Sequence, residues 1–144
     1  MKKSVFLIVI SFFLTGCPEE IRNDRYYILE NNSNHELVLK FYFQGSLLEY
    51  LTTALSENEN YSGQISYQNE DVFSFPSNAF KADSIVIDFD NLKRGTYAID
   101  FLNASFSEPL NRNVFRHENF EHIGNDNFLF SITEEDYNRA EDIN

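Results

Sequence analysis

Over residues 35–43, large apolar side chains occupy every second position, and this pattern constrains the fold more than any other feature of the chain. The alternating residues are Leu37, Leu39, Phe41 and Phe43. Because successive side chains of a β-strand point to opposite faces, the pattern predicts a strand with one face in the core. Residues 84–89 repeat the pattern. The side chains expected inside are Ile85, Ile87 and Phe89, and those on the opposite face are Ser84, Val86 and Asp88.

Shorter runs rich in aromatic and β-branched residues predict the other strands. These are expected at 26–30, 49–55, 61–67, 95–101 and 128–132, with one more short strand near Val114. The leucines within 47–55 also fit one face of a helix, so that segment is ambiguous.

Polar segments predict the connections between these strands. The Asn-rich residues 31–34 favour a turn, which would join 26–30 and 35–43 as a hairpin with a four-residue loop. Residues 90–91 are expected to turn the chain so that 84–89 and 95–101 pair. The polar segment 69–79 contains Pro76 and is predicted to be a loop.

The C-terminal part begins with a helix signal. Thr133 is followed three positions later by Asp136, which matches the side-chain pattern that caps a helix N-terminus. We therefore expect a short helix to about Ala140. Many short strands and one late helix predict an all-β fold, a single-domain β-sandwich (Ig-like or similar) with a short C-terminal helix over residues 26–144.

The N-terminus has the layout of a secretory signal. Two lysines precede an apolar run at residues 5–14, and small Thr15 and Gly16 lead to Cys17. The ten residues of that run reach about 15 Å as a helix, half of a ~30 Å hydrocarbon core, so a permanent span is not expected.

The Leu-Thr-Gly-Cys sequence that ends at Cys17 resembles the lipobox of bacterial lipoproteins. The resemblance implies that residues 1–16 are a signal peptide that is removed. It also implies that Cys17 receives a diacylglyceryl group, for which a thiol is the suitable nucleophile. Residues 17–25 would then be a lipidated tether, with the membrane as a partner through the anchor at Cys17. The alternative is an ordinary cleaved signal with an incidental Cys17.

Three further segments, 26–34, 82–90 and 130–137, are similar to small Bacteroidota lipoproteins, a group that implies a location and a fold but no activity. Pro18-Glu19-Glu20 is similar to the acidic tract that directs such proteins to the cell surface. The expected location is therefore the outer membrane, at either its periplasmic face or the cell surface.

The charge of the chain excludes some partners. The formal net charge is −12, and loss of Lys2 and Lys3 with the leader would make it −14. Such a domain is not expected to bind nucleic acid or to adsorb to an anionic leaflet. Cys17 is the only cysteine, so a disulfide within the chain is excluded.

Residues His117, Glu118 and His122 form the densest group of metal-ligand side chains. The two histidines are five positions apart, whereas a helical zinc-protease motif needs four. An irregular loop could bring the three onto one ion, but a solvated polar loop is the favoured interpretation. The sequence therefore predicts no metal and no cofactor.

Other short patterns allow weaker hypotheses. Asp83, Asp88 and Asp90 supply carboxylates that calcium accepts, although the calcium-loop spacing is missing. The sequence Asp83-Ser84-Ile85 is similar to the O-glycosylation signal of exported Bacteroidota proteins. Three Asn-x-Ser matches are interpreted as polar turns; they begin at Asn31, Asn60 and Asn103.

No spacing in the sequence selects a catalytic triad or a phosphate loop, so an enzyme is not expected. We expect a non-catalytic binding or structural module of the cell envelope. One alternative is an inhibitor or immunity-type lipoprotein against a basic partner. Another is a glycan-binding accessory protein, which would need an exposed platform of aromatic side chains. The candidates for that platform are Tyr27, Tyr42, Tyr61 and Tyr67.

Overall fold

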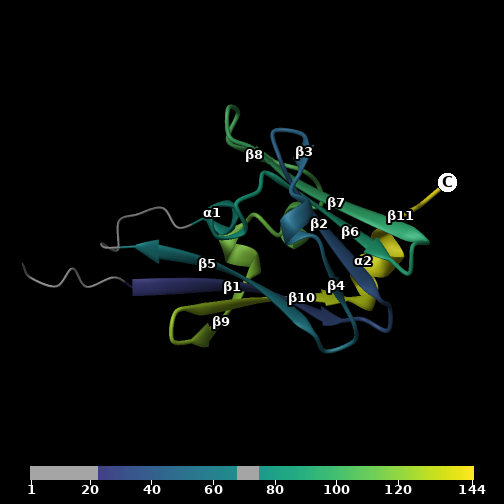
Figure 1. Ribbon diagram of the computed structural model, residues 1–144, viewed down its shortest axis with the longest axis horizontal. Helices are drawn as coiled ribbons and strands as arrows, with labels where there is room; N and C mark the ends of the chain where they lie inside the picture. The colour runs from purple at the N-terminus through teal and green to yellow at the C-terminus, as the bar shows by residue number, and fades with distance from the viewer. Residues whose placement is uncertain (1–22, 68–74) are drawn as a thin grey trace, which may run out of the picture.

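Two β-sheets pack face to face in the computed structural model, which describes residues 23–67 and 75–144 (Figure 1). This confirms the expected β-sandwich with a short C-terminal helix. The expected signal peptide, residues 1–16, and Cys17 lie outside the described residues. No helix among the described residues is long and apolar enough to cross a membrane.

The smaller sheet has four strands, and the first strand of the chain is one of its two central ones. Their order is β5 (Asn60–Tyr67), β1 (Asn23–Asn32), β10 (Asn127–Thr133) and β9 (Glu121–Gly124). β1 pairs antiparallel with β5 and parallel with β10, so the two ends of the domain's sequence are hydrogen-bonded to each other. β1 begins at Asn23, three residues before the strand that the sequence predicted.

The second sheet has seven strands, and all of its pairs are antiparallel. Its main order is β11 (Glu141–Asp142), β7 (Lys93–Asp100), β6 (Ser84–Phe89), β2 (Leu37–Phe43) and β3 (Ser46–Leu47). β4 (Thr53–Leu55) pairs with β2, and β8 (Ser105–Phe106) pairs with β7. The pairing of β6 with β7 confirms the turn expected at residues 90–91.

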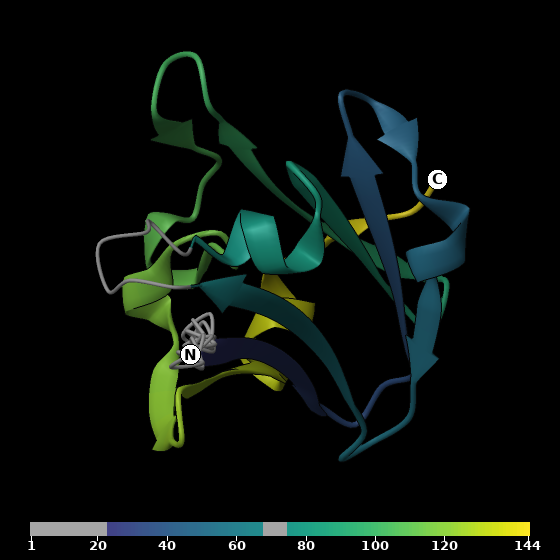
Figure 2. The same cartoon turned by 60° about the vertical axis from the view of Figure 1, so that its left-hand side comes forward.

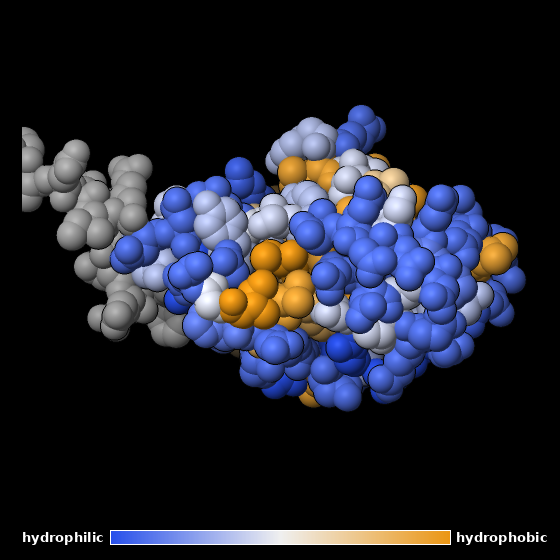
Figure 3. All heavy atoms as spheres, turned by 90° about the horizontal axis from the view of Figure 1, so that it is seen from below, coloured by the Kyte–Doolittle hydropathy of each residue, from blue (hydrophilic) through white to orange (hydrophobic). Residues whose placement is uncertain are grey.

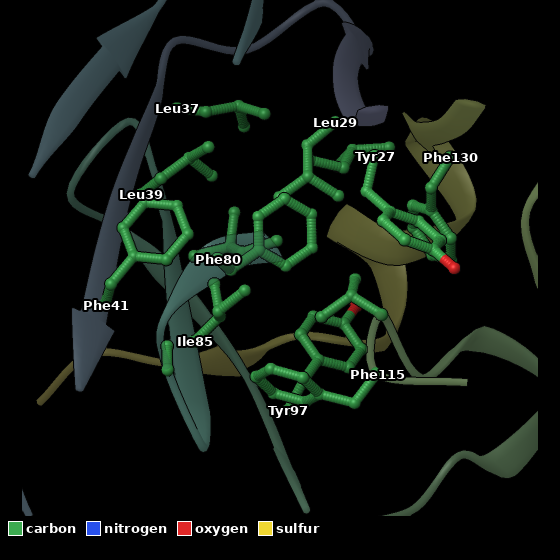
Figure 4. Packing of buried hydrophobic residues seen from close by; sticks show 14 of the residues in the cluster. Tyr27, Leu29, Leu37, Leu39, Phe41, Phe80, Ile85, Tyr97, Phe115 and Phe130 are labelled. Atoms are coloured by element: carbon green, nitrogen blue, oxygen red, sulfur yellow. The ribbon is translucent and has the colours of Figure 1, made fainter. Parts of the chain in front are cut away.

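The core lies between the sheets and is rich in aromatic side chains (Figure 4). Ile85, Ile87 and Phe89 of β6 are fully buried, as their alternation predicted. Tyr27 and Leu29 of β1 approach them from the opposite sheet. Burial of each such side chain contributes about 1.5–3 kcal/mol.

Within the described residues, two α-helices and three 3₁₀ turns complete the fold. They are α1 (Pro76–Phe80), α2 (Glu134–Arg139), η1 (Glu49–Leu51), η2 (Leu110–Arg112) and η3 (His117–Asn119). Thr133 and Asp136 form the predicted capping box at the start of α2. This reciprocal pair satisfies backbone N–H groups that the first helical turn leaves without partners.

The expected hairpin of residues 26–30 with 35–43 is wrong, because β1 and β2 belong to different sheets. The side chain of Asn31, which is fully buried, explains the crossing. Its amide donates to the carbonyls of His35 (2.8 Å) and Leu55 (3.0 Å), and its oxygen accepts from Ser33 N (3.1 Å). Asn31 thus fixes a corner between the sheets.

Three other expectations about local structure are corrected. Residues 49–51 form η1 rather than the start of a strand, because Leu48 and Leu51, three positions apart, both pack against the core. Val114 is fully buried in a loop and is in no strand. Part of the expected loop at 69–79 forms α1, which begins with Pro76 at a position where a missing N–H costs nothing; residues 69–74 lie outside the described residues.

Candidate functional site

Two hairpins of the seven-stranded sheet, on either side of β6, end in exposed apolar side chains. Phe43 closes β2, and Phe101 and Leu102 follow β7 directly. Their exposed fractions are 45% for Phe43, 53% for Phe101 and 96% for Leu102. Figure 2 shows the β2–β3 and β7–β8 connections projecting at the top of the molecule. We call Phe43, Phe101 and Leu102 the apolar tip.

The β7–β8 turn holds its two apolar residues outward with a carboxylate. Asp100 Oδ1 accepts hydrogen bonds from the backbone N–H groups of Leu102 (2.9 Å) and Asn103 (3.2 Å). Asp100 Oδ2 accepts from the side-chain amide of Asn103 (2.6 Å). These hydrogen bonds lower the pKa of Asp100, and the one from the Asn103 side chain has the largest effect. The turn is therefore internally hydrogen-bonded around an ionised carboxylate.

Asp83 ties this turn to the neighbouring hairpin. Its carboxylate accepts from the Gln44 N–H (2.7 Å), at a turn where Gln44 and Gly45 have positive φ values of 50° and 76°. Its own N–H donates to the Tyr42 carbonyl, and its carbonyl accepts from Ile99 N, each at 2.9 Å. Asp83 therefore fixes the ends of β2 and β7 relative to each other.

Two grooves flank the apolar tip, and Phe43 and Phe101 line both. One, of about 430 Å³, continues along Ile99 and Leu102. The other, of about 370 Å³, reaches α1 and includes Lys81 and Ser77. The Oγ of Ser77 is buried and has no hydrogen-bond partner among the described residues.

A second apolar area lies on the outer face of the four-stranded sheet (Figure 3). Ile28 of β1 and Leu129 of β10 are cross-strand partners on this face. Their side chains point away from the core, whereas that of the neighbouring Tyr27 is buried in it. Both are only partly exposed, and polar residues surround the area in Figure 3. Ile28 and Leu129 are each less exposed than the three residues of the apolar tip.

Among the described residues, His117, Glu118 and His122 are not brought together as metal ligands. Nδ1 of His117 lies 2.8 Å from the Tyr27 hydroxyl, and the rings of His117 and His122 both lie against Phe128. The Glu118 carboxylate pairs instead with Arg116 (2.7 Å from Nε). Within residues 23–67 and 75–144, no three metal-ligand side chains gather in a way that could hold an ion.

The three aspartates also lie apart. Asp88 lies on the outer face of β6, as predicted, yet only 2% of its side chain is exposed, because Lys40 (2.7 Å) and Arg94 (2.6 Å) cover it. The hydrogen bond from Arg94 has the largest effect and lowers the pKa of Asp88. A smaller lowering by Lys40 adds to it, and together they outweigh the burial of the carboxylate, which raises the pKa. Asp90 binds His35 instead, at 2.5 Å. The calcium hypothesis therefore has no geometric support in this region.

The four tyrosines do not share a surface. Tyr27 is fully buried and Tyr61 packs against Phe80, whereas Tyr42 lies on β2 of the other sheet. The hydroxyl of Tyr67 donates to Asp126 (2.5 Å). This dispersal counts against the aromatic platform that a glycan-binding protein needs.

Ser84 is partly exposed in the middle of the seven-stranded sheet, and its glycosylation stays a prediction. Of the three Asn-x-Ser sites, Asn31 is the structural corner described above. Asn60 begins β5, and Asn103 donates to Asp100 in the β7–β8 turn.

Sequence reasoning missed the ion pair that holds α2 to the sandwich. Arg112 Nε lies 2.9 Å from Asp136 Oδ1, and Nη2 donates to the Ser131 carbonyl (2.7 Å). The guanidinium also lies over the Phe130 ring, 4.3 Å from its centroid. Asp136 was identified only as a capping residue, and no local pattern links it to a residue 24 positions earlier.

Comparison of the chain with protein-family models, with curated proteins and with solved structures finds no match.

Proposed function

We propose that this chain is a bacterial lipoprotein. Its leader, residues 1–16, is removed, and Cys17 carries a diacylglyceryl thioether that holds the protein at the outer membrane. The β-sandwich is a non-catalytic binding or structural module of the cell envelope. The observation that carries the proposal is the Leu-Thr-Gly-Cys sequence at the end of a short basic and apolar leader.

The layout of the domain is compatible with this anchor. The described fold begins at Asn23, only six positions after Cys17, and from there the chain enters a central strand of the smaller sheet. A lipid at Cys17 would therefore lie close to the folded domain. One acyl chain binds a bilayer only marginally, so a stable attachment needs two or more.

The contacts of the polar side chains support a binding role over a catalytic one. The carboxylates of Asp83, Asp88 and Asp90 each accept hydrogen bonds that hold turns or neighbouring strands. The apolar tip, in contrast, has large apolar side chains exposed on hydrogen-bonded turns. Exposed apolar surface that the fold holds in place is typical of an interaction site.

Metabolic labelling with palmitate tests the proposal. The wild-type chain should incorporate label and fractionate with membranes. Cys17→Ala should lose the label and appear in soluble fractions, whereas Ser11→Ala, a matched change within the leader, should change neither. Label that persists in Cys17→Ala would contradict the proposal.

A further inference from the structure

We propose that the apolar tip inserts into the bilayer that carries the lipid anchor, so that the domain contacts the membrane at two points. The inference rests on the proposed function, because it takes Cys17 to be lipidated. It assigns a lipid surface, rather than a protein, as the partner of Phe43, Phe101 and Leu102.

The length of the tether keeps the domain near the membrane. Six positions separate Cys17 from Asn23, and a fully extended chain of that length spans at most about 20 Å. In Figures 1 and 2, α1 lies between the start of β1 and the two hairpin ends. α1 contacts β1 and also lines the groove that Phe43 and Phe101 share, so one short helix separates the apolar tip from β1.

The two carboxylates beside the tip accept hydrogen bonds within the protein, which lowers the cost of bringing the tip to a lipid surface. The Asp100 carboxylate binds three N–H donors within its own turn, and that of Asp83 binds the Gln44 N–H. Beside the exposed polar residues Gln44 and Asn103, the side chains that face outward include two phenylalanines and a leucine. Insertion of such side chains is favourable because it removes apolar surface from water.

The tip is formed by the ends of two hairpins, and its two phenylalanines line two grooves. Lys81 lines the groove beside α1, where its ammonium group could lie among lipid phosphates.

Site-specific fluorescence of the lipidated full chain tests the inference. Leu102→Cys is labelled with the environment-sensitive dye NBD and reconstituted in phosphatidylethanolamine–phosphatidylcholine vesicles. Leu92→Cys is the matched control, because Leu92 is also an exposed leucine (61%) but precedes β7, whereas Leu102 follows it. A blue-shifted emission and severalfold weaker quenching by iodide are expected at position 102 and not at position 92.

One double variant and the wild-type chain distinguish failure of the inference from failure of the proposed anchor. Phe43→Ser with Phe101→Ser should return the dye at position 102 to water-like emission, while circular dichroism shows an unchanged fold. Equal iodide quenching at positions 102 and 92 would overturn the inference, and the tip would then be available to a protein partner. If the wild-type chain itself takes up NBD at Cys17, the anchor is absent and the proposed function fails instead.

Discussion

The rings of His35 and Tyr137 stack almost in parallel, with their centroids 3.6 Å apart. This contact joins the β1–β2 connection to α2, two segments that are about 100 residues apart. His35 Nδ1 lies 2.5 Å from Asp90 Oδ2, and its Nε2 lies 3.3 Å from Glu134. A titratable ring therefore links three segments, the β1–β2 connection, the β6–β7 turn and the start of α2.

The stability of the domain should depend on pH through this ring. Burial opposes the charge on His35, but hydrogen bonds to Asp90 and Glu134 outweigh it and raise the pKa of His35 above 6.5. The hydrogen bond from His35, followed by one from the Glu36 N–H, lowers the pKa of Asp90 below 3.8. The stabilisation that charged His35 gives the fold is therefore complete below pH 6.5. It is lost as the pH rises through the raised pKa of His35. The stabilisation that ionised Asp90 gives the fold is complete above pH 3.8. It is lost as the pH falls through the lowered pKa of Asp90.

We therefore expect the pair to stabilise the fold most between about pH 4 and 6.5. Thermal unfolding followed by circular dichroism across pH 4–9 should show a loss of stability on the alkaline side of this window. His35→Gln should remove that loss. An unchanged pH profile in His35→Gln would show that another group is responsible.

Arg112→Ala should destabilise the domain strongly. Asp136 is almost fully buried, with 1% of its side chain exposed, so loss of its partner leaves an uncompensated charge in the interior. The expected loss in the free energy of unfolding, measured by urea denaturation, is about 3–5 kcal/mol. Arg139→Ala is the control, because Arg139 pairs with Glu135 at the surface, and its loss should cost less than about 0.5 kcal/mol. Equal effects of the two variants would contradict the assigned role of Arg112.

Gly63→Ala should destabilise the contact of α1 with β5. A methyl group at this position would lie 2.6 Å from Cδ1 of Phe80 and 2.8 Å from the Ala79 carbonyl oxygen, so backbone has to move. We expect a loss of about 1–3 kcal/mol in the free energy of unfolding. At Gly95 the nearest atom is an ordinary 3.5 Å away, and Gly95→Ala should be neutral or stabilise by up to about 1 kcal/mol. A neutral Gly63→Ala would show that α1 does not pack this closely.

Asn31→Ala should weaken the corner between the sheets. It removes both donors to the His35 and Leu55 carbonyls, and the Asn31 side chain that supplies them is fully buried. The expected loss in the free energy of unfolding is about 3 kcal/mol, since each unsatisfied buried group costs about 1–3 kcal/mol. The exposed neighbour Asn32 provides a control, and Asn32→Ala should stay within about 0.5 kcal/mol of the wild type. Similar denaturation midpoints for the two variants would refute this role of Asn31.

Local patterns were sufficient to predict several parts of the fold. The alternation at residues 84–89 identified the buried side chains of β6, and Thr133 with Asp136 identified the start of α2. Both signals depend on residues only a few positions apart. The parallel pairing of β1 with β10 joins residues about 100 positions apart, and no local pattern encodes it.

Side-chain burial was harder to predict than strand position. Asp88 lies on the expected face of its strand, but Lys40 and Arg94 from neighbouring strands cover it. Phe101 was expected to end a paired strand, whereas the strand ends at Asp100, whose carboxylate turns the chain and leaves Phe101 outside. Of the apolar tip, only Phe43 was predicted on the core face of a strand, and it lies at the end of β2 with 45% of its surface exposed.

The N-terminal peptide of the native protein, purified from membranes and analysed by mass spectrometry, tests the lipid anchor most directly. Our account predicts a peptide that begins at Cys17 and carries the added mass of a diacylglyceryl group, with or without an amide-linked acyl chain. A peptide that begins at Met1, or one with a free thiol at Cys17, would contradict it.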